Sequence, residues 1–590
     1  MSTTIIAEKP EAAHRIYTIL SKKWPVEVKA AKGHLMQLWI RGIDSARHIS
    51  QLPLTEVYWR IPKVCKKVLE DIRASVLVAT NTIIATDFDR EGEVIGYNVY
   101  RYVLNPRRYY PLYDVDPGRI RRMYFSALIE SEIMYAFQNT ERMNERLLAQ
   151  GLGRNLADTL FGLNISKAIT LRFKRMYPKL TQAISLGRVQ SPVLAYVYEN
   201  TRASIEVLRP HFFDDSSTTY EYYIEVEGSH YRLDLPRDVD IESDYVEVLN
   251  VRKVKHTEPQ SKPFFNTDGI LQESPLPPEA TMQTLETLYL KGYATYPRTQ
   301  SRYVPINFLR VVIDRMNSHG ILPEGFSEEH LHPMSRQQTD KKMAIILTPE
   351  GIDAYVSGKL SGREKIIATT ILERMIVALA PPLEVESIYI NIRAGGITHE
   401  VVWSENIVNP EVCIDTKIVE QRPEIRIGTY PLIKIVKKRY EKTIFSVLAR
   451  EIHMIGDKDI VVWMAKQGLG TEATRYHYPT LLRERHYTTS ENLTTLLGAK
   501  ISQIIKAIGI SPTMTKEVED RLNAIEKLAD IEEFKEFIVK VTKEYLDALL
   551  EIPDSELKFI CPECDNELQL ANTRYGLIAF CQQCKKFFPV

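Results

Sequence analysis

Four acidic residues follow two short apolar segments that have the composition of buried β-strands. Asp87, Asp89 and Glu91 are spaced two apart after one segment, and Glu8 follows the other. Proteins bind Mg²⁺ through a few carboxylates together with waters and phosphate oxygens. The DxDxE spacing alone is more often typical of a solvated acidic loop. An acid at the end of a second strand favours a magnesium site.

Tyr296 lies in the sequence Thr-Tyr-Pro-Arg-Thr, two residues before Arg298. A tyrosine hydroxyl has a pKa near ~10, so it attacks phosphorus only where a base or a positive field assists it. The fixed donor fork of Arg298 suits a phosphate oxygen. The chain has 31 tyrosines, and in isolation this motif is equally well explained as a Tyr-Pro turn.

Two glycine-containing stretches, residues 185–192 and 468–475, offer donors for nucleic acid. Glycine lets a ligand approach the backbone closely, and polar side chains beside it can contact phosphates or base edges. A well-capped helix start explains either stretch equally well. The candidate DNA-binding side chains are Arg188, Gln190, Ser191, Thr474 and Arg475.

Four of the six cysteines form two CxxC pairs near the end of the chain: Cys561 with Cys564, and Cys581 with Cys584. This spacing is typical of a tetrahedral Cys₄ zinc site in a zinc ribbon. A redox dithiol pair is the alternative, but no thioredoxin-like pattern accompanies it.

Alternating strand and helix patterns must position the acids. Residues 3–7 and 82–86 are expected strands, each followed by a helix, which predicts a parallel sheet with ligands at its carboxyl edge. Further along, residues 146–200 and 440–550 read as helical. So do residues 265–384, which lie between two alternating, strand-like stretches. This order suggests one domain inserted into another.

Composition restricts the function classes. A chain of 590 residues should contain several domains. Basic and acidic residues balance at 76 each, so a purely electrostatic DNA coat is disfavoured. We find neither a membrane-length apolar run nor a secretory signal, and expect a cytoplasmic protein. The phosphate-binding loop of ATPases, GxxxxGK followed by Ser or Thr, does not occur.

Taken together, the motifs resemble the type IA DNA topoisomerases, most closely the topoisomerase III branch. The resemblance runs from Thr3 to about Tyr487. It covers the opening Ile-Ala-Glu-Lys-Pro, the acidic motif, Phe125–Leu128, residues 185–192, residues 263–267, the tyrosine motif and residues 468–475, in the family's order.

The resemblance implies a multidomain α/β plus α plus β fold, a type IA toroid. A Toprim domain would span 1–145, and a helical DNA-binding domain 146–205 and 440–550. A β-rich arch would span 206–262 and 385–439. A helical domain carrying the active-site tyrosine would span 263–384, and the Cys₄ zinc ribbon 555–590.

The resemblance also implies roles for individual residues. Tyr296 would attack a phosphodiester and retain the 5′ phosphate, with Arg298 at the scissile phosphate and Lys9 at the leaving 3′ oxygen. Mg²⁺ would serve religation. No ATP is required, because one phosphodiester is exchanged for another. The magnesium ligands would be Glu8, Asp87, Asp89 and Glu91.

The implied partners are single-stranded and negatively supercoiled DNA, with a helicase as a further candidate and no membrane. The protein would be a monomer that relaxes negative supercoils, decatenates DNA, or does both. Three alternatives are the topoisomerase subunit of a split reverse gyrase, a cleavage-deficient single-strand DNA-binding protein, and another Toprim enzyme such as a primase or nuclease. The last has no use for the tyrosine motif.

One position departs from the family pattern. Lys342 stands where the family usually has a histidine, and Leu347 replaces a proline. A lysine near a phosphate stays cationic and is a poor proton shuttle near neutrality. We expect Lys342 to bind DNA electrostatically. The alternative is a solvated surface lysine, with His330 or His332 in the histidine's role.

Overall fold

The structure is a computed structural model of the chain. It describes residues 2–178, 183–208, 218–235, 240–338, 342–414, 422–438, 455–561, 563–573 and 576–589. The parts of the expected helical and arch ranges at 209–217 and 439–454 lie outside the described residues, as does Lys341. No helix among the described residues is long and apolar enough to cross a membrane.

A five-stranded sheet near the N-terminus has the order β2-β1-β5-β7-β8. Strand β1 (Thr3–Ala7) runs parallel to both β2 (Val26–Ala30) and β5 (Asn81–Ala85). The short strands β7 (Arg121–Arg122) and β8 (Glu141–Arg142) complete the sheet. The expected parallel sheet is confirmed. Ala7 pairs with Ala85, so the residues that follow both strands emerge at one edge.

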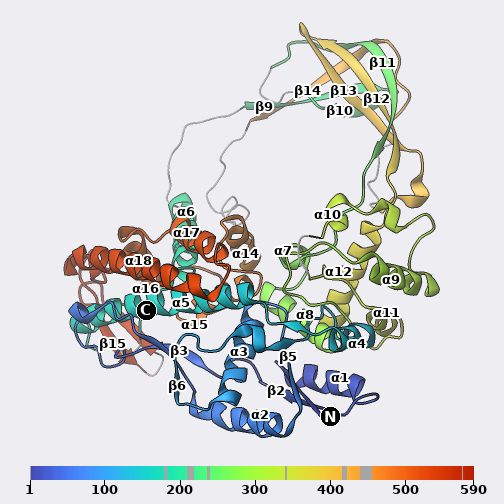
Figure 1. Cartoon of the computed structure of the whole chain (residues 1–590). Helices are drawn as coiled ribbons and strands as arrows, with labels where there is room; N and C mark the ends of the chain where they lie inside the picture. The colour runs from blue at the N-terminus through green and yellow to red at the C-terminus, as the bar shows by residue number, and fades with distance from the viewer. Residues whose placement is uncertain are drawn as a thin grey trace.

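Helices cover this sheet (Figure 1). They are α1 (Pro10–Leu20), α2 (Lys66–Val78), α3 (Arg90–Leu104) and α4 (Glu130–Gln138). Helix α3 begins where Asp89 accepts a hydrogen bond of 2.8 Å from the Gly92 amide. An acidic N-cap satisfies an unpaired amide and suits the positive end of the helix dipole.

A second, three-stranded sheet is inserted in the same region. It consists of β3 (Gln37–Ile40), β4 (Val57–Arg60) and β6 (Tyr109–Tyr110), in that order. One face is buried, with Leu38, Trp59 and Tyr110 each at most 5% exposed. The other face is more open.

Two segments far apart in sequence form one helical layer (Figure 1). The long helix α5 (Glu145–Met176) packs against α18 (Ile531–Glu551) through a shared apolar core. The first segment adds α6 (Gln190–Leu208). The second segment adds α14 (Asp457–Lys466), α15 (Tyr478–Glu484), α16 (Leu496–Ala507) and α17 (Pro512–Asn523).

Residues 263–380 form a separate helical unit with its own core, which includes Phe264, Leu285 and Ile371. We call it the tyrosine unit. Its helices are α7 (Thr267–Glu273), α8 (Pro278–Leu290), α9 (Ile306–Ser318), α10 (Pro333–Arg336), α11 (Pro349–Val356) and α12 (Gly362–Ala378).

A six-stranded sheet stands apart from the other layers at the far end of the tyrosine unit (Figure 1). Its order is β10-β9-β14-β11-β12-β13, all antiparallel. Strand β11 pairs with β12, and the chain between them folds into the tyrosine unit. The strands are β9 (Thr218–Val226), β10 (Ser229–Leu233), β11 (Tyr245–Glu258), β12 (Leu383–Ala394), β13 (Ile397–Ile407) and β14 (Gly428–Lys438).

The C-terminal residues form a three-stranded sheet of β15 (Gln569–Thr573), β16 (Gly576–Cys581) and β17 (Lys586–Pro589). It is anchored to the helical layer. The ring of Phe559 lies 5.3 Å from that of Tyr177, whose hydroxyl accepts a hydrogen bond of 2.9 Å from the Phe559 amide.

Candidate active site

Tyr296 lies where the tyrosine unit meets the N-terminal sheet. Its amide donates to the Ser126 carbonyl at 2.7 Å, while the neighbouring Thr295 amide donates to Ile346 of its own unit at 3.0 Å. The ring is only 2% exposed and stands edge-on to Tyr289, with the ring centres 5.2 Å apart. Backbone contacts to two units therefore fix the ring at the junction.

The Tyr296 hydroxyl donates a hydrogen bond of 2.7 Å to Asp89. Burial, then the negative charges of Asp89 and Asp87, raise the pKa of Tyr296 well above 10. Burial alone would raise the pKa of Asp89 as well, but Arg298 and Lys342 outweigh it and lower that pKa. The phenol is thus neutral and Asp89 ionised in this arrangement.

Arg298 carries the positive charge nearest to the tyrosine in sequence. Its guanidinium contacts Glu286 at 2.6 Å, Glu91 at 3.5 Å and Asp89 at 3.9 Å. Its Nε is buried without a hydrogen-bond partner among the described residues. A buried donor without a partner is costly, and a phosphate oxygen would satisfy it.

The acids at the strand ends are crowded and buried. Glu8 is 6% exposed and Asp87 4%. Burial, reinforced by neighbouring carboxylates, raises the pKa of Glu8 well above its usual value, and burial also raises the pKa of Asp87. Lys9 lies 3.2 Å from Asp87. Burial opposes the charge of Lys9, but Asp87 and Glu286 raise its pKa, so it stays cationic.

These acids fit a loosely held Mg²⁺. No three of these acids place one oxygen each within 4.8 Å of the others, so they do not form a closed set of ligands. Mg²⁺ needs only one or two carboxylates when waters and phosphate oxygens complete its shell. A divalent cation would also relieve the repulsion that raises the pKa of Glu8.

Three further ionisable residues contact the site, and the sequence did not single them out: His34, Glu286 and Glu472. His34 lies 3.2 Å from Glu91, and this contact holds the pKa of Glu91 below its usual value. Glu286 contacts both Arg298 and Lys9. His34 and Glu286 lie in no motif that the sequence shows, whereas Glu472 lies within residues 468–475, where only Thr474 and Arg475 were expected to take part.

Lys342 lies inside the site. Its side chain is 11% exposed, and Nζ donates to the Arg298 carbonyl at 3.0 Å and lies 3.8 Å from Glu472. The suggestion of a solvated surface lysine is therefore wrong. Lys342 lines a cavity of about 650 Å³ beside Asp89 and Glu91, which Arg154 and Arg475 of the helical layer also line. His330 and His332 do not line it.

The glycine-containing stretches are placed differently from expectation. Arg188 is 2% exposed and lies 2.7 Å from both Asp158 and Glu519. Gln190 and Ser191 are also buried, at 4% and 0%. Arg188 joins α5 to α17, whereas Gln190 donates to the Ser185 carbonyl and Ser191 accepts from the Gly187 amide of the same loop. Their contacts with DNA stay a prediction.

The second stretch borders the cavity but is paired internally. Arg475 contacts Asp268 of the tyrosine unit through two hydrogen bonds of 2.8 Å. The Thr474 hydroxyl accepts from Arg154 at 3.2 Å. Both residues line the cavity. The pair Arg475–Asp268 joins the helical layer to the tyrosine unit.

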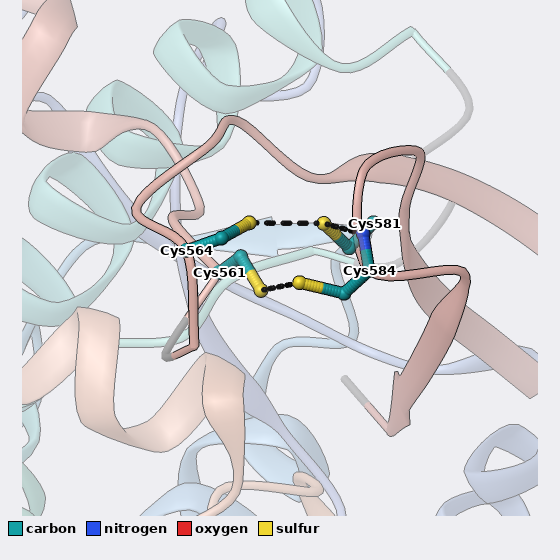
Figure 2. A group of neighbouring side chains, drawn as sticks. All are labelled: Cys561, Cys564, Cys581 and Cys584. Carbon is teal, nitrogen blue, oxygen red and sulfur yellow. Dashed lines mark hydrogen bonds between the residues drawn. The ribbon is translucent and has the colours of Figure 1, made fainter.

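The four C-terminal cysteines converge on one point (Figure 2). All four sulfurs lie within 4.8 Å of one another, with Cys564 and Cys581 at 3.5 Å and Cys561 and Cys584 at 3.9 Å. Four ligands at the Zn–S length of about 2.3 Å would lie about 3.8 Å apart in a tetrahedron. The donor set therefore fits zinc.

Comparisons with known proteins agree with this geometry. Residues 142–533 match the family model "DNA topoisomerase", and residues 3–128 match "Toprim domain". The chain is 27% identical to "DNA topoisomerase 1" of Pyrococcus horikoshii, covering 96% of this chain and 89% of that protein. It is 24% identical to "DNA topoisomerase 3" of Staphylococcus aureus, covering 99% and 88%.

A solved structure shares the fold. Full-length topoisomerase I from Thermotoga maritima superimposes with a TM-score of 0.71 at 19% identity, covering 100% of this chain and 97% of that one. At that identity the likeness concerns the fold alone.

Proposed function

Since this chain belongs to the type IA DNA topoisomerases, we propose that Tyr296 is its nucleophile and that it cuts and rejoins single DNA strands without ATP. The observation that carries the proposal is the position of the Tyr296 hydroxyl, 2.7 Å from the acidic loop of the Toprim domain and beside Arg298. An acidic loop, a tyrosine and an arginine from two units meet at one buried point.

The proposed cleavage exchanges one phosphodiester for another. The Tyr296 oxygen forms a bond to phosphorus, the bond from phosphorus to the 3′ oxygen breaks, and the proton lost by the phenol is balanced by one gained at the 3′ hydroxyl. Because the number of phosphodiesters is unchanged, the bond energy is retained for religation. Religation is the reverse reaction.

Arg298 and Lys9 supply the positive charge for this step. Arg298 offers its unpaired Nε to a phosphate oxygen as negative charge develops there. Lys9, kept cationic by Asp87, stabilises the leaving 3′ oxygen. Glu8, Asp87, Asp89 and Glu91 would hold Mg²⁺, which supplies charge neutralisation during religation. Chelation should therefore suppress relaxation, and full relaxation in excess EDTA would contradict this assignment.

The substrate would be single-stranded DNA, such as the unpaired regions of negatively supercoiled DNA. The cavity beside Asp89 lies between the Toprim region, the helical layer and the tyrosine unit, where a strand could reach Tyr296. Relaxation, decatenation or both would follow. The relatives carry the names topoisomerase 1 and topoisomerase 3; we favour the topoisomerase III branch on the motifs. We propose a monomer that can act beside a helicase.

The test is cleavage of labelled single-stranded DNA by Tyr296→Phe, which removes only the attacking oxygen. Covalent adducts should disappear while DNA binding is retained. Tyr293→Phe, three residues upstream in the same loop, is the matched control and should form adducts like the wild type. Adducts at the wild-type level in Tyr296→Phe would overturn the assignment. Their absence from the wild type would favour a cleavage-deficient DNA-binding protein.

The split reverse gyrase reading is tested separately. Positive supercoiling that appears only when a helicase subunit and ATP are added would support it. If adding the helicase subunit and ATP leaves relaxation unchanged, the protein acts as a stand-alone topoisomerase.

A further inference from the structure

The open face of the small β3-β4-β6 sheet carries aromatic and basic side chains in register. Across the strands, Gln37 pairs with Arg60, and Arg60 pairs with Tyr109; Trp39 pairs with Tyr58. Directly paired residues point to the same face of a sheet, and so do residues two apart along a strand. These five side chains therefore share one face, opposite the buried Leu38, Trp59 and Tyr110.

The rings on this face are accessible and held in place by guanidinium groups. Tyr109 is 46% exposed, whereas Trp39 and Tyr58 are half-buried. The Arg60 guanidinium lies 3.7 Å from the centre of the Trp39 ring, and hydrogen bonds of 3.0 and 3.3 Å to Gln37 hold it there. Tyr58 and Tyr109 stand edge to face, 5.1 Å apart. The face is thus ordered before any ligand binds.

The charge on this face is positive. Arg108 lies over the Tyr109 ring at 5.1 Å, and among the described residues neither Arg108 nor Arg60 forms an ion pair with a carboxylate. Two acids lie nearby: Glu56 pairs with Arg41 at 2.8 Å, while Asp44 accepts from a neutral donor, the Trp39 indole, at 3.1 Å and offsets part of the positive charge. Two guanidiniums are therefore available to a polyanion.

A lysine of helix α5 lies beside Asp44, the residue that contacts the Trp39 indole. Lys167 contacts the Asp44 carbonyl at 3.5 Å. Burial lowers the pKa of Lys167, and so do the neighbouring charges of Arg47 and Lys174, while the charge of Asp44 raises it. Like charges gathered in this way repel one another, and bound phosphates would relieve the repulsion.

From this juxtaposition we infer that the open face of the β3-β4-β6 sheet is a second binding surface for single-stranded nucleic acid, distinct from the cleavage site. Bases would stack on Tyr58, Tyr109 and the Arg60–Trp39 pair, and phosphates would contact Arg60 and Arg108. Aromatic rings interleaved with arginines that form no ion pair among the described residues are the combination that binds single strands with little sequence preference. None of these residues lines the cavity beside Asp89 and Glu91.

The inference goes beyond cleavage and can be tested without it. In the full chain carrying Tyr296→Phe, binding of fluorescein-labelled oligo-dT of about 10 and about 40 nucleotides is measured over a salt series. The same lengths of oligo-U distinguish DNA from RNA. We expect the longer strand to gain affinity from the second surface.

Two double variants separate stacking from charge. Tyr58→Ala with Tyr109→Ala should weaken the longer strand about tenfold or more at an unchanged salt slope. Arg60→Gln with Arg108→Gln should reduce the salt slope by about 1.4, the value for two single-strand phosphate contacts. The control is Arg121→Gln with Arg142→Gln, two exposed arginines paired across β7 and β8 of the other sheet.

Ultraviolet cross-linking of oligo-dT, mapped by mass spectrometry, should give adducts at Trp39, Tyr58 or Tyr109. Melting curves check that the variants fold. If the double tyrosine variant is destabilised, the salt slope of the double arginine variant tests the inference instead. Affinity and salt slope equal to those of the control pair, with no cross-link on this face, would overturn the inference and leave the face as a contact for another protein.

Discussion

The hydroxyl of Tyr296 donates a hydrogen bond of 2.7 Å to Asp89, a residue 207 positions earlier in the chain. This contact suggests that Asp89 accepts the phenolic proton during cleavage. The opposed pKa directions argue against that, because the pKa of Tyr296 lies well above 10 and that of Asp89 below 3.8. Transfer of the proton from the phenol to Asp89 is therefore unfavourable in this arrangement.

We therefore predict that Asp89→Asn keeps cleavage. Adduct formation on single-stranded DNA should stay within about tenfold of wild type. Religation, which depends on the magnesium acids in our proposal, should slow by about a hundredfold or more, so adducts should accumulate. Gel analysis after a salt-induced reversal step measures both. A loss of cleavage of about a thousandfold would instead make Asp89 the proton acceptor.

Glu8→Gln should stabilise the protein while impairing religation. Burial and neighbouring acids raise the pKa of Glu8 above 4.5, so ionising it is costlier in the folded than in the unfolded chain. That cost is absent below pH ~4.5. The cost of ionising Glu8 grows as the pH rises from the unfolded to the folded pKa, and it is constant at any higher pH. Removing it at pH 7 should gain on the order of 1 kcal/mol.

Thermal melting of wild type and Glu8→Gln across pH measures this effect without Mg²⁺. The two melting temperatures should converge in acid, and added Mg²⁺ should stabilise the wild type more than the variant. A variant that is less stable than wild type at neutral pH would show that Glu8 is not strained.

Lys342 should bind DNA through its charge. Lys342→Ala should weaken single-strand binding and lower the salt slope by about 0.7, while Lys342→Arg should be mild. Lys342→Gln keeps a donor for the Arg298 carbonyl and removes the charge, so it should resemble alanine in binding. The exposed Lys291, in the same unit, provides the control Lys291→Ala. An unchanged slope in Lys342→Ala would leave only a role in positioning Arg298.

Asp268→Asn should make Nη1 of Arg475 available to DNA. Both hydrogen bonds to Asp268 come from Nη1 and tie the tyrosine unit to the helical layer, while Nε and Nη2 donate to the carbonyls of Leu469 and Gly470. Neutralising Asp268 should raise single-strand affinity and increase the salt slope by about 0.7. Asp353→Asn removes an exposed, ion-paired aspartate of the same unit and serves as the control. Lower stability with an unchanged slope would mark Arg475 as structural.

The C-terminal cysteines should hold about one zinc per chain. Cys581→Ser with Cys584→Ser should release it and lower the melting temperature, because the ribbon shares buried contacts with the helical layer through Phe559. Adduct formation at Tyr296 should persist, since no cysteine lies near it. Elemental analysis of full-length protein purified without chelator checks the metal, and a zinc content near zero would refute the site.

The sequence alone determined what depends on neighbours along the chain. Buried runs and helix starts predicted the parallel sheet, and paired strand ends bring Glu8 and Asp87 to one edge. The CxxC spacing predicted the cysteine group, because each pair forms within one tight turn. The resemblance of the tyrosine motif predicted the roles of Tyr296 and Arg298, which stay a prediction.

Tertiary structure decided which charges meet. Arg188 and Arg475 look alike in sequence as phosphate ligands, yet packing places Arg188 against Glu519, 331 residues away, and Arg475 against Asp268 of another unit. Glu286 and His34 join the site with no motif at all. Local spacing constrains only a few neighbouring residues. The partner of a buried charge depends instead on how separate units pack. A buried charge needs an opposite charge nearby, and the fold can supply it from any part of the chain.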